Sequence, residues 1–248
     1  MALIYFIPTP PSKIAIATSA IKGTTFEYYA QRYRERFARA NVRLELRESP
    51  GSVETLRLLQ DVSSDVQIAF MYGGTSDGEH APGLLSLGVI YNNPFWIFYS
   101  SAEPFDRLSQ LTGKRIAVGP PGTAVRQAAE HVLGTDGVTA ETATFLPIAG
   151  SAAVEALRDG KVDAYWIASA PESPAVQTML RMPNVRLMSF ARAEALTRIF
   201  PDLVRLTLPQ GVFDIAANIP PNDVSLIATT VRILIRDDLH PHTASIAD

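Results

Sequence analysis

The chain has 248 residues, of which 47% are hydrophobic and 19% charged, and its formal net charge is −3. These values describe a soluble globular protein with enough residues for one large domain or two smaller lobes. The sequence has no basic block, which argues against nucleic acid as a partner, and no cysteine, which excludes disulfides, thiol catalysis and cysteine-bound metal sites.

Residues 1–11 form a short apolar run ended by prolines. The run is too short to span a membrane, and it lacks the basic start and cleavage site of a secretory signal. Two interpretations stay open: a remnant of an export signal or anchor, or a natural start with a small hydrophobic arm.

The first half of the chain predicts alternating strands and helices. An apolar strand is expected over Lys13–Thr18, and an amphipathic helix follows over residues 26–39. The next elements are a strand over Val42–Leu46, a short helix with Ser52 as its N-cap, and a strand over Gln67–Phe70. Two apolar stretches, Leu84–Tyr91 and Pro94–Ser100, then lie on either side of Asn92-Asn93, and the second is a candidate for a strand that crosses between lobes.

The second half predicts a similar order. A short helix and turn over Leu108–Gly113 lead into a strand beginning at Lys114. The expected helices are Thr123–Leu133, Ala152–Arg158 with a C-cap at Asp159-Gly160, and Ala175–Arg181. A strand is expected over Val185–Met188, and Ser225–Ile235 is the candidate for a return crossing.

The two halves resemble each other in sequence. Three segments of the first half, beginning at Lys13, Gly51 and Asp65, recur at Lys114, Gly150 and Asp163, at offsets of 101, 99 and 98 positions. Because order and spacing are both kept, we expect two α/β lobes, each with a mostly parallel sheet flanked by helices. Ligands of such sheets bind outside the carboxyl ends of the strands, so a small anion held in a cleft between the lobes is expected.

The segment Gly119-Pro-Pro-Gly-Thr-Ala-Val-Arg126 first suggests a Walker A loop. The comparison fails because such a loop ends in glycine, lysine and a hydroxyl residue, where this chain has Ala124, Val125 and Arg126. A glycine-rich turn before a helix remains, and its free N–H groups favour an anion. We expect Gly122, Thr123 and Arg126 to contribute, although an ordinary tight turn and a solvated arginine explain these residues equally well.

The matching turn of the first half, Ser19–Thr25, offers the hydroxyls of Ser19, Thr24 and Thr25 and the charge of Lys22 to an anion. The alternative interpretation of Lys22 is a solvated surface lysine. The helix starts at Gly51-Ser52 and Gly150-Ser151 add further donors, although their serines serve mainly as N-caps.

Aromatic residues gather near predicted strand ends, where they commonly line ligand pockets. The set comprises Tyr72, Tyr91, Phe95, Tyr165 and Trp166. Since most aromatics of an α/β protein are core residues, we select Tyr72, Tyr91 and Trp166 as ligand contacts.

No catalytic constellation is recognisable. The histidines have no partners at metal-ligand spacing, and His240-Pro-His242 is interpreted as a surface loop. A nucleophile elbow is also missing. We therefore predict a binding protein without cofactor or metal, not an enzyme.

With these segments laid out, the chain resembles the TAXI family of solute receptors, which are associated with TRAP transporters. The resemblance runs from Lys13 to Leu239. It rests on the strand and turn from Lys13, on Gly51–Leu59, Gly113–Gly122 and Ala156–Trp166, and on Pro171 and Pro174.

The resemblance implies a type II periplasmic binding protein fold with two crossing strands. Lobe 1 would comprise residues 12–95 and 226–248, and lobe 2 residues 96–225. It also implies capture of a carboxylate or amino acid for membrane permease subunits, in the periplasm or on the extracytoplasmic face.

The chain departs from the family pattern in two turns. Ser19–Thr25 replaces a run of glycines, and Gly122-Thr-Ala-Val-Arg126 replaces Gly-Ser-Gly-Thr-Arg, so the family's ligand does not transfer. Family members also continue beyond the position that corresponds to Asp248, into further helices. We therefore interpret this chain as the soluble segment of a longer, membrane-anchored member. Two alternatives stay open: a membrane-tethered ligand sensor with the same cleft, and a lyase-type enzyme on the same fold.

Overall fold

The computed structural model describes residues 11–19, 25–73 and 81–247. These residues divide into two compact units. Unit 1 runs up to Ile90 and resumes at Val231, and unit 2 comprises Tyr91–Thr230. Within the described ranges, no helix combines the length and the apolar character needed to cross a bilayer.

Unit 1 is built on three parallel strands, which parts of two long strands extend. Its parallel strands are β1 (Lys13–Ser19), β2 (Arg43–Ser49) and β3 (Val66–Tyr72), with β1 between the other two. The end of β10 (Val224–Arg236) pairs antiparallel with β3.

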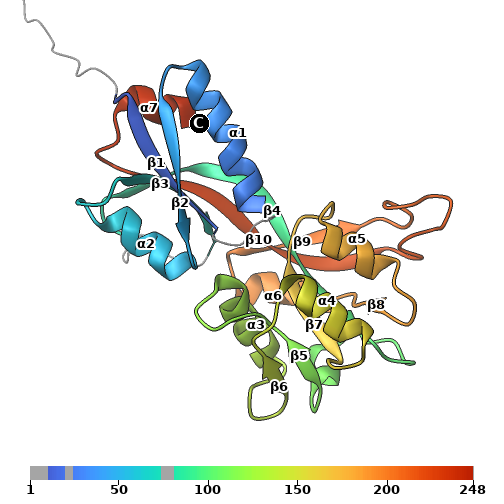
Figure 1. Cartoon of the computed structure of the whole chain (residues 1–248). Helices are drawn as coiled ribbons and strands as arrows, with labels where there is room; N and C mark the ends of the chain where they lie inside the picture. The colour runs from blue at the N-terminus through green and yellow to red at the C-terminus, as the bar shows by residue number, and fades with distance from the viewer. Residues whose placement is uncertain (1–10, 20–24, 74–80, 248) are drawn as a thin grey trace, which may run out of the picture. The chain divides into compact units, whose positions relative to one another are not determined.

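The helices of unit 1 cover both faces of this sheet (Figure 1). Helix α1 (Thr25–Arg39) lies over β1 and β2, and α2 (Ser52–Gln60) lies over β1 and β3. The chain moves across the sheet in one direction from β1 to β2 and in the opposite direction from β2 to β3. Because both crossovers are right-handed, their helices α1 and α2 lie on opposite faces of the sheet. The predicted apolar face of α1 is confirmed, because Ala30 and Phe37 are buried and Tyr33 packs edge-on against Phe70 of β3.

Unit 2 repeats the same winding. Strands β5 (Arg115–Ala117), β6 (Thr144–Leu146) and β7 (Ala164–Ala168) are parallel, with β5 between β6 and β7. Helices α3 (Ala124–Gly134) and α4 (Gly150–Arg158) make the two crossovers. The order β6-β5-β7 matches β2-β1-β3, so the internal repeat predicted from the sequence is confirmed as a repeated topology.

Two long strands belong partly to each unit. Strand β4 (Leu84–Tyr99) pairs antiparallel with β7, and β10 pairs with β3 at one end and with β9 (Leu203–Leu208) at the other. The predicted break at Asn92-Asn93 is wrong, since β4 continues through both residues. Asn93 is buried in the strand, where the surrounding sheet overrides the turn preference of asparagine.

The remaining elements complete the two units. In unit 2 they are η1 (Leu108–Leu111), α5 (Pro174–Leu180), β8 (Arg186–Leu187) and α6 (Ala193–Ile199). In unit 1, α7 (Pro241–Ala247) packs against α1. The interpretation of His240-Pro-His242 as a loop is therefore wrong: Pro241 begins a helix, a position where its fixed φ and missing N–H are tolerated.

Candidate functional site

The turn after β5 holds the start of α3 in a defined position. Gly119 and Gly122 have φ angles of +86° and +80°, which favour glycine. Thr123 is the N-cap of α3: its Oγ1 accepts from the Arg126 N–H at 3.3 Å and donates to the Pro120 carbonyl at 2.8 Å. The next N–H groups of the helix have no intrahelical acceptor, so this turn presents backbone donors at the carboxyl end of β5.

Arg126 is tied into the same turn. Its Nε donates to Glu130 at 2.6 Å, its Nη1 donates to the Gly119 carbonyl at 3.4 Å, and its guanidinium lies 5.3 Å from the Phe145 ring centroid. The side chain is only 13% exposed. Arg126 thus stabilises the turn and already has a carboxylate partner, and any ligand would share this guanidinium with Glu130.

The start of α4 is capped differently from the prediction. The N-cap is Ala149, and Ser151 lies inside the helix, so its predicted capping role is wrong. The hydroxyl of Tyr165 accepts the Gly150 N–H at 2.9 Å. Burial raises the pKa of Tyr165 to about 12, while the Gly150 N–H opposes that rise. The sequence did not distinguish Tyr165 from core aromatics, because its partner is distant along the chain.

Trp166 lies in the core of unit 2, next to Tyr165 but on the opposite face of β7. Its ring centroid is 4.9 Å from that of Phe95, and it meets Phe190 edge-on. The Nε1–H is buried and has no acceptor in the described part of the chain. By contrast, Trp96 on the neighbouring strand donates its Nε1–H to the Ser169 carbonyl at 2.8 Å. A buried donor without an acceptor costs about 1–3 kcal/mol, which makes Trp166 a candidate for an external acceptor.

In unit 1, the loop after β2 is closed by side-chain hydrogen bonds. Ser49 Oγ donates to the Gly51 carbonyl at 3.1 Å, and Thr55 Oγ1 lies 2.8 Å from Ser49 Oγ. Gly51 is the N-cap of α2, without a side-chain hydrogen bond, and Ser52 is the first helical residue. The predicted N-cap role of Ser52 is therefore wrong, because Ser49 and Thr55 close the loop. Ser52 nevertheless lies at the carboxyl edge of the sheet.

Thr18, near the end of β1, escaped the sequence prediction. It is buried, and its Oγ1 has no hydrogen-bond partner among the described residues. An apolar strand gives no signal that a threonine within it lacks a partner.

At the end of β3, the centroid of the Tyr72 ring lies 4.8 Å from that of the Phe26 ring.

The predicted site residues are distributed over both units. Ser52 and Tyr72 lie at the carboxyl edge of the unit 1 sheet, where Ser19 ends β1 and Thr25 begins α1. Gly122, Thr123 and Arg126 share one turn of unit 2, Trp166 lies in β7, and Tyr91 is half-buried in β4. Lys22 and Thr24 lie outside the described residues. In the ranges that are described, no cluster of histidine, aspartate and glutamate could hold a metal ion.

Comparison with known proteins places this topology in a family. A model of the NMT1-like family matches residues 16–244. The chain belongs to the NMT1-like family. No curated protein matches it in sequence. The family match does not extend to TAXI receptors in particular, so that finer resemblance stays a proposal.

Solved structures with this topology share little sequence with the NMT1-like chain. It aligns with the alkanesulfonate-binding protein SsuA of Xanthomonas axonopodis bound to MOPS (TM-score 0.56, 17% identity, 97% of this chain and 71% of the other). PhnD1 of Prochlorococcus marinus in complex with methylphosphonate gives a TM-score of 0.62 at 9% identity, and the alignment covers 95% of this chain and 82% of the other. An ancestral arginine-binding protein bound to arginine gives a TM-score of 0.57 at 13% identity, and the alignment covers 95% of this chain and 89% of the other. The predicted type II periplasmic binding protein fold is thereby confirmed.

Proposed function

We propose that this NMT1-like protein is an extracytoplasmic solute-binding protein that captures a small organic anion, a carboxylate or an amino acid. The observation that carries the proposal is the buried Trp166 Nε1–H, which has no acceptor among the residues that the structure describes, in a unit whose parallel strands also lead into two helix N-termini. An anion accepts hydrogen bonds and so matches these donors.

The repeated topology extends this proposal to unit 1. Ser52 and Tyr72 lie at the carboxyl edge of its sheet, as Thr123 does at the carboxyl end of β5 in unit 2. We propose that both edges carry anion-binding groups, as the duplication suggests. Solved structures with the same fold bind sulfonate, phosphonate or arginine ligands, which is consistent with an anionic or zwitterionic solute.

We further propose that the protein delivers its ligand to TRAP-type permease subunits, from the periplasm or the extracytoplasmic face of the membrane. It rests on the resemblance of Gly51–Leu59, Gly113–Gly122 and Ala156–Trp166 to TAXI receptors. Uptake of the identified ligand into vesicles that contain a TRAP permease, with and without this protein, tests it. A signalling response without uptake would favour a sensor, and chemical change of the bound compound in NMR spectra would favour a lyase.

The ligand is sought by a thermal-shift screen of dicarboxylates, amino acids, oxoacids, sulfonates and phosphonates. A compound at one hundred times its Kd stabilises the folded state by about 2.7 kcal/mol, a readily measured shift. Trp166→Phe, which keeps a ring but removes the N–H, should weaken binding of the hit, and Trp96→Phe is the control because that indole already has an acceptor. Unchanged affinity in Trp166→Phe would remove the observation on which the proposal rests.

A further inference from the structure

Strand β2 is the outer strand of the unit 1 sheet. Among the described residues, its one strand neighbour is β1, in parallel register from Lys13 opposite Arg43 to Ser19 opposite Ser49. An outer strand presents unpaired backbone groups along its free edge, and such an edge can accept another strand. The question is what this edge is suited to bind.

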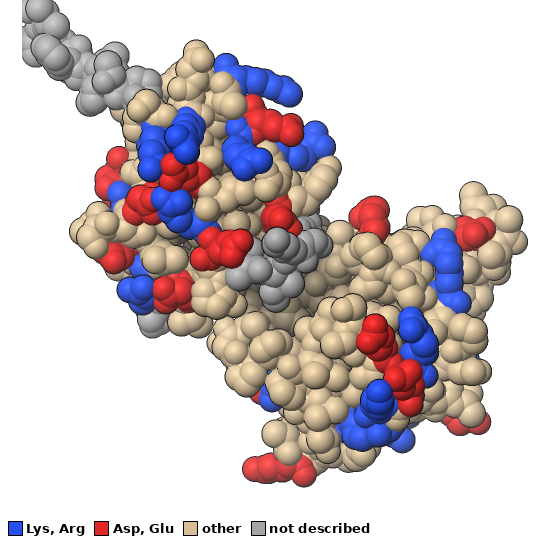
Figure 2. All heavy atoms as spheres, viewed as in Figure 1, with Lys and Arg blue, Asp and Glu red and all other residues tan. Residues whose placement is uncertain are grey.

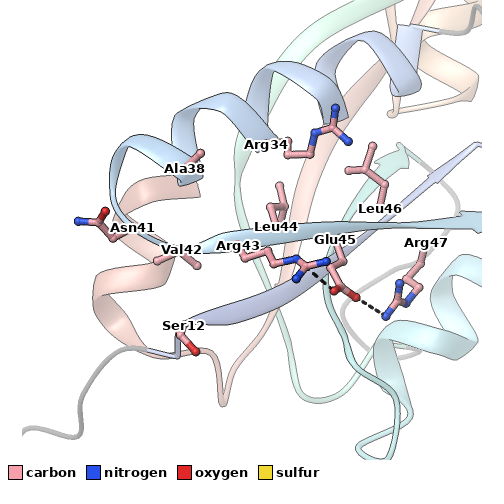
Figure 3. A pocket seen from close by; sticks show the side chains of 10 residues that line it. All are labelled: Ser12, Arg34, Ala38, Asn41, Val42, Arg43, Leu44, Glu45, Leu46 and Arg47. Atoms are coloured by element: carbon pink, nitrogen blue, oxygen red, sulfur yellow. Dashed lines mark hydrogen bonds and ion pairs between the residues drawn. The ribbon is translucent and has the colours of Figure 1, made fainter.

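A pocket of about 720 Å³ runs along this free edge (Figure 3). It is lined by the consecutive residues Val42 to Arg47, together with Ser12, Asn41, and Arg34 and Ala38 of α1. Side chains of a strand alternate between its two faces, so a pocket that touches six consecutive residues must follow the strand edge. At about 3.3 Å per residue, the lined stretch is about 20 Å long, which suits an extended peptide better than a compact solute.

The backbone groups on this edge can be assigned. The Arg43 N–H donates to the Ser12 carbonyl at 2.9 Å, towards β1. In a parallel strand, alternate residues direct both N–H and carbonyl to the same side, so Leu44 and Leu46 direct theirs away from β1. These two residues therefore offer the hydrogen bonds that an added strand needs.

The two faces beside the edge differ in chemistry. On the α1 side, Leu44 is buried and Leu46 half-buried, and the small Ala38 leaves space above them. On the other side, the Glu45 carboxylate forms ion pairs with three basic side chains. The N···O distances are 3.1 Å to Lys13, 3.5 Å to Arg43 and 2.6 Å to Arg47.

The charged residues around the edge leave a positive excess. Of the residues that line the pocket, Arg34, Arg43 and Arg47 are basic and Glu45 is acidic. Outside the lining, Lys13 pairs with Glu45, Asp65 pairs with Arg47, and the exposed Glu48 follows near the end of β2. The Arg43 side chain is 78% exposed and available to a partner. Figure 2 shows basic side chains interleaved with acidic ones over the region of α1 and β2.

We propose that the free edge of β2 binds an extended acidic segment of a partner protein, which adds to the sheet as a further strand. Its backbone would pair with Leu44 and Leu46, its apolar side chains would lie below Ala38, and its carboxylates would meet Arg34 and Arg43. This mode of recognition takes affinity from the backbone and specificity from alternate side chains. A second copy of this chain fits less well, because its own β2 edge carries the same excess of arginine.

The proposal is tested with a fluorescent peptide of alternating valine and glutamate that spans the six lining positions. NMR spectra should show new hydrogen-exchange protection at the Leu44 and Leu46 amides and none at Arg43 or Glu45, whose amides point inward. The same peptide with lysine in place of glutamate, and one with an N-methylated backbone, should both fail to bind.

Charge-reversal variants give the matched comparison. Arg34→Glu combined with Arg43→Glu should weaken the Kd of the glutamate peptide at least about tenfold, the effect expected of two lost charge contacts. Arg36→Glu, an exposed arginine of the same helix that does not line the pocket, should leave it within about twofold. Both variants should retain solute binding in the thermal-shift assay, which separates this proposal from the proposed function.

Three results would overturn the proposal. Equal binding of the N-methylated peptide would exclude strand addition, and equal binding of the lysine peptide would exclude the acidic partner. Concentration-dependent dimerisation in analytical ultracentrifugation, lost in Arg43→Glu, would assign the edge to a second copy of the chain instead.

Discussion

At the scale of single residues, the repeat preserves a carboxylate but changes its partner. Asp163 accepts from Arg115, whereas its counterpart Asp65 pairs with Arg47. The position that matches Arg115 in the first half is Ile14, which has no charge to offer. Each aspartate directly precedes the last parallel strand of its unit. The Asp163 pair links β7 to the adjacent β5, whereas the Asp65 pair reaches across β1 to β2.

The Asp163 pair makes stability depend on pH in a defined direction. The side-chain hydrogen bonds from Arg115 hold the pKa of Asp163 below its ordinary value, despite the opposing effect of burial. Because the folded-state pKa is the lower one, the stabilisation is present above about pH 4, the unfolded value, and is lost as the pH falls through the folded value. Asp163→Asn should therefore be less stable than the parent protein at pH 6, and the difference should shrink in acid.

Urea unfolding at a series of pH values measures this difference. Glu141→Gln is the control, because this exposed carboxylate makes no ion pair with the described residues. A constant difference between Asp163→Asn and the parent across the whole acid range would contradict the prediction.

A second residue-scale prediction concerns the Tyr165 hydroxyl. Tyr165→Phe leaves the Gly150 N–H without its acceptor and should lower the free energy of unfolding by about 1–3 kcal/mol. Tyr28→Phe removes a hydroxyl from an exposed residue and should change it by less than about 0.5 kcal/mol. Chemical denaturation distinguishes the two, and equal stability of both variants would show that water replaces the Tyr165 hydroxyl at no cost.

At the scale of elements, helix starts differ in how they are capped. The start of α3 is capped locally by Thr123, whereas α4 depends on Tyr165 of a later strand. Local capping involves only residues around the helix start, and the sequence predicted that α3 begins near Thr123, although Thr123 was assigned to the ligand and not to the cap. Capping by a distant strand depends on the packed sheet, which explains the error at Ser151.

The local cap leads to a testable substitution. Thr123→Ala should cost about 1 kcal/mol of stability, and Thr123→Ser should recover most of it because serine keeps the capping oxygen. Thermal unfolding of the three proteins provides the measurement. Equal loss in the serine and alanine variants would assign the effect to the threonine methyl group and not to the cap.

At the scale of the whole molecule, β10 contributes to both units. Its Ile227 is fully buried in the unit 2 core, and its Val231–Ile235 segment pairs with β3 in unit 1. A single continuous strand with pairing in both units should couple their unfolding. Unit 1 also needs residues that follow all of unit 2 along the chain, so unit 1 is built from two separate stretches of sequence, whereas unit 2 is one continuous stretch.

The expected consequence is one cooperative transition that shifts as a whole. Ile227→Ala should lower the free energy of unfolding by about 2–5 kcal/mol, and Ile215→Ala, at a side chain that is 90% exposed, should leave it within about 0.5 kcal/mol. Circular dichroism and tryptophan fluorescence recorded in the same urea series should give coincident curves. Both tryptophans report on unit 2, so separation of the two curves would show that the units unfold independently.

The amino-acid sequence alone was enough to predict the internal repeat, the alternation of strands and helices in both halves, and the start of α3, but not α6 or β9. These features depend on apolar periodicity and on neighbours within a few residues, which are visible along the chain. The packed structure was needed to show that β4 continues through Asn92-Asn93 and that Tyr165 caps α4. It was also needed to show that, among the described residues, the Trp166 N–H lacks an acceptor and β2 has a free edge. Each of these depends on groups brought together from distant positions, and no local pattern records which partner a buried donor or a strand edge will have.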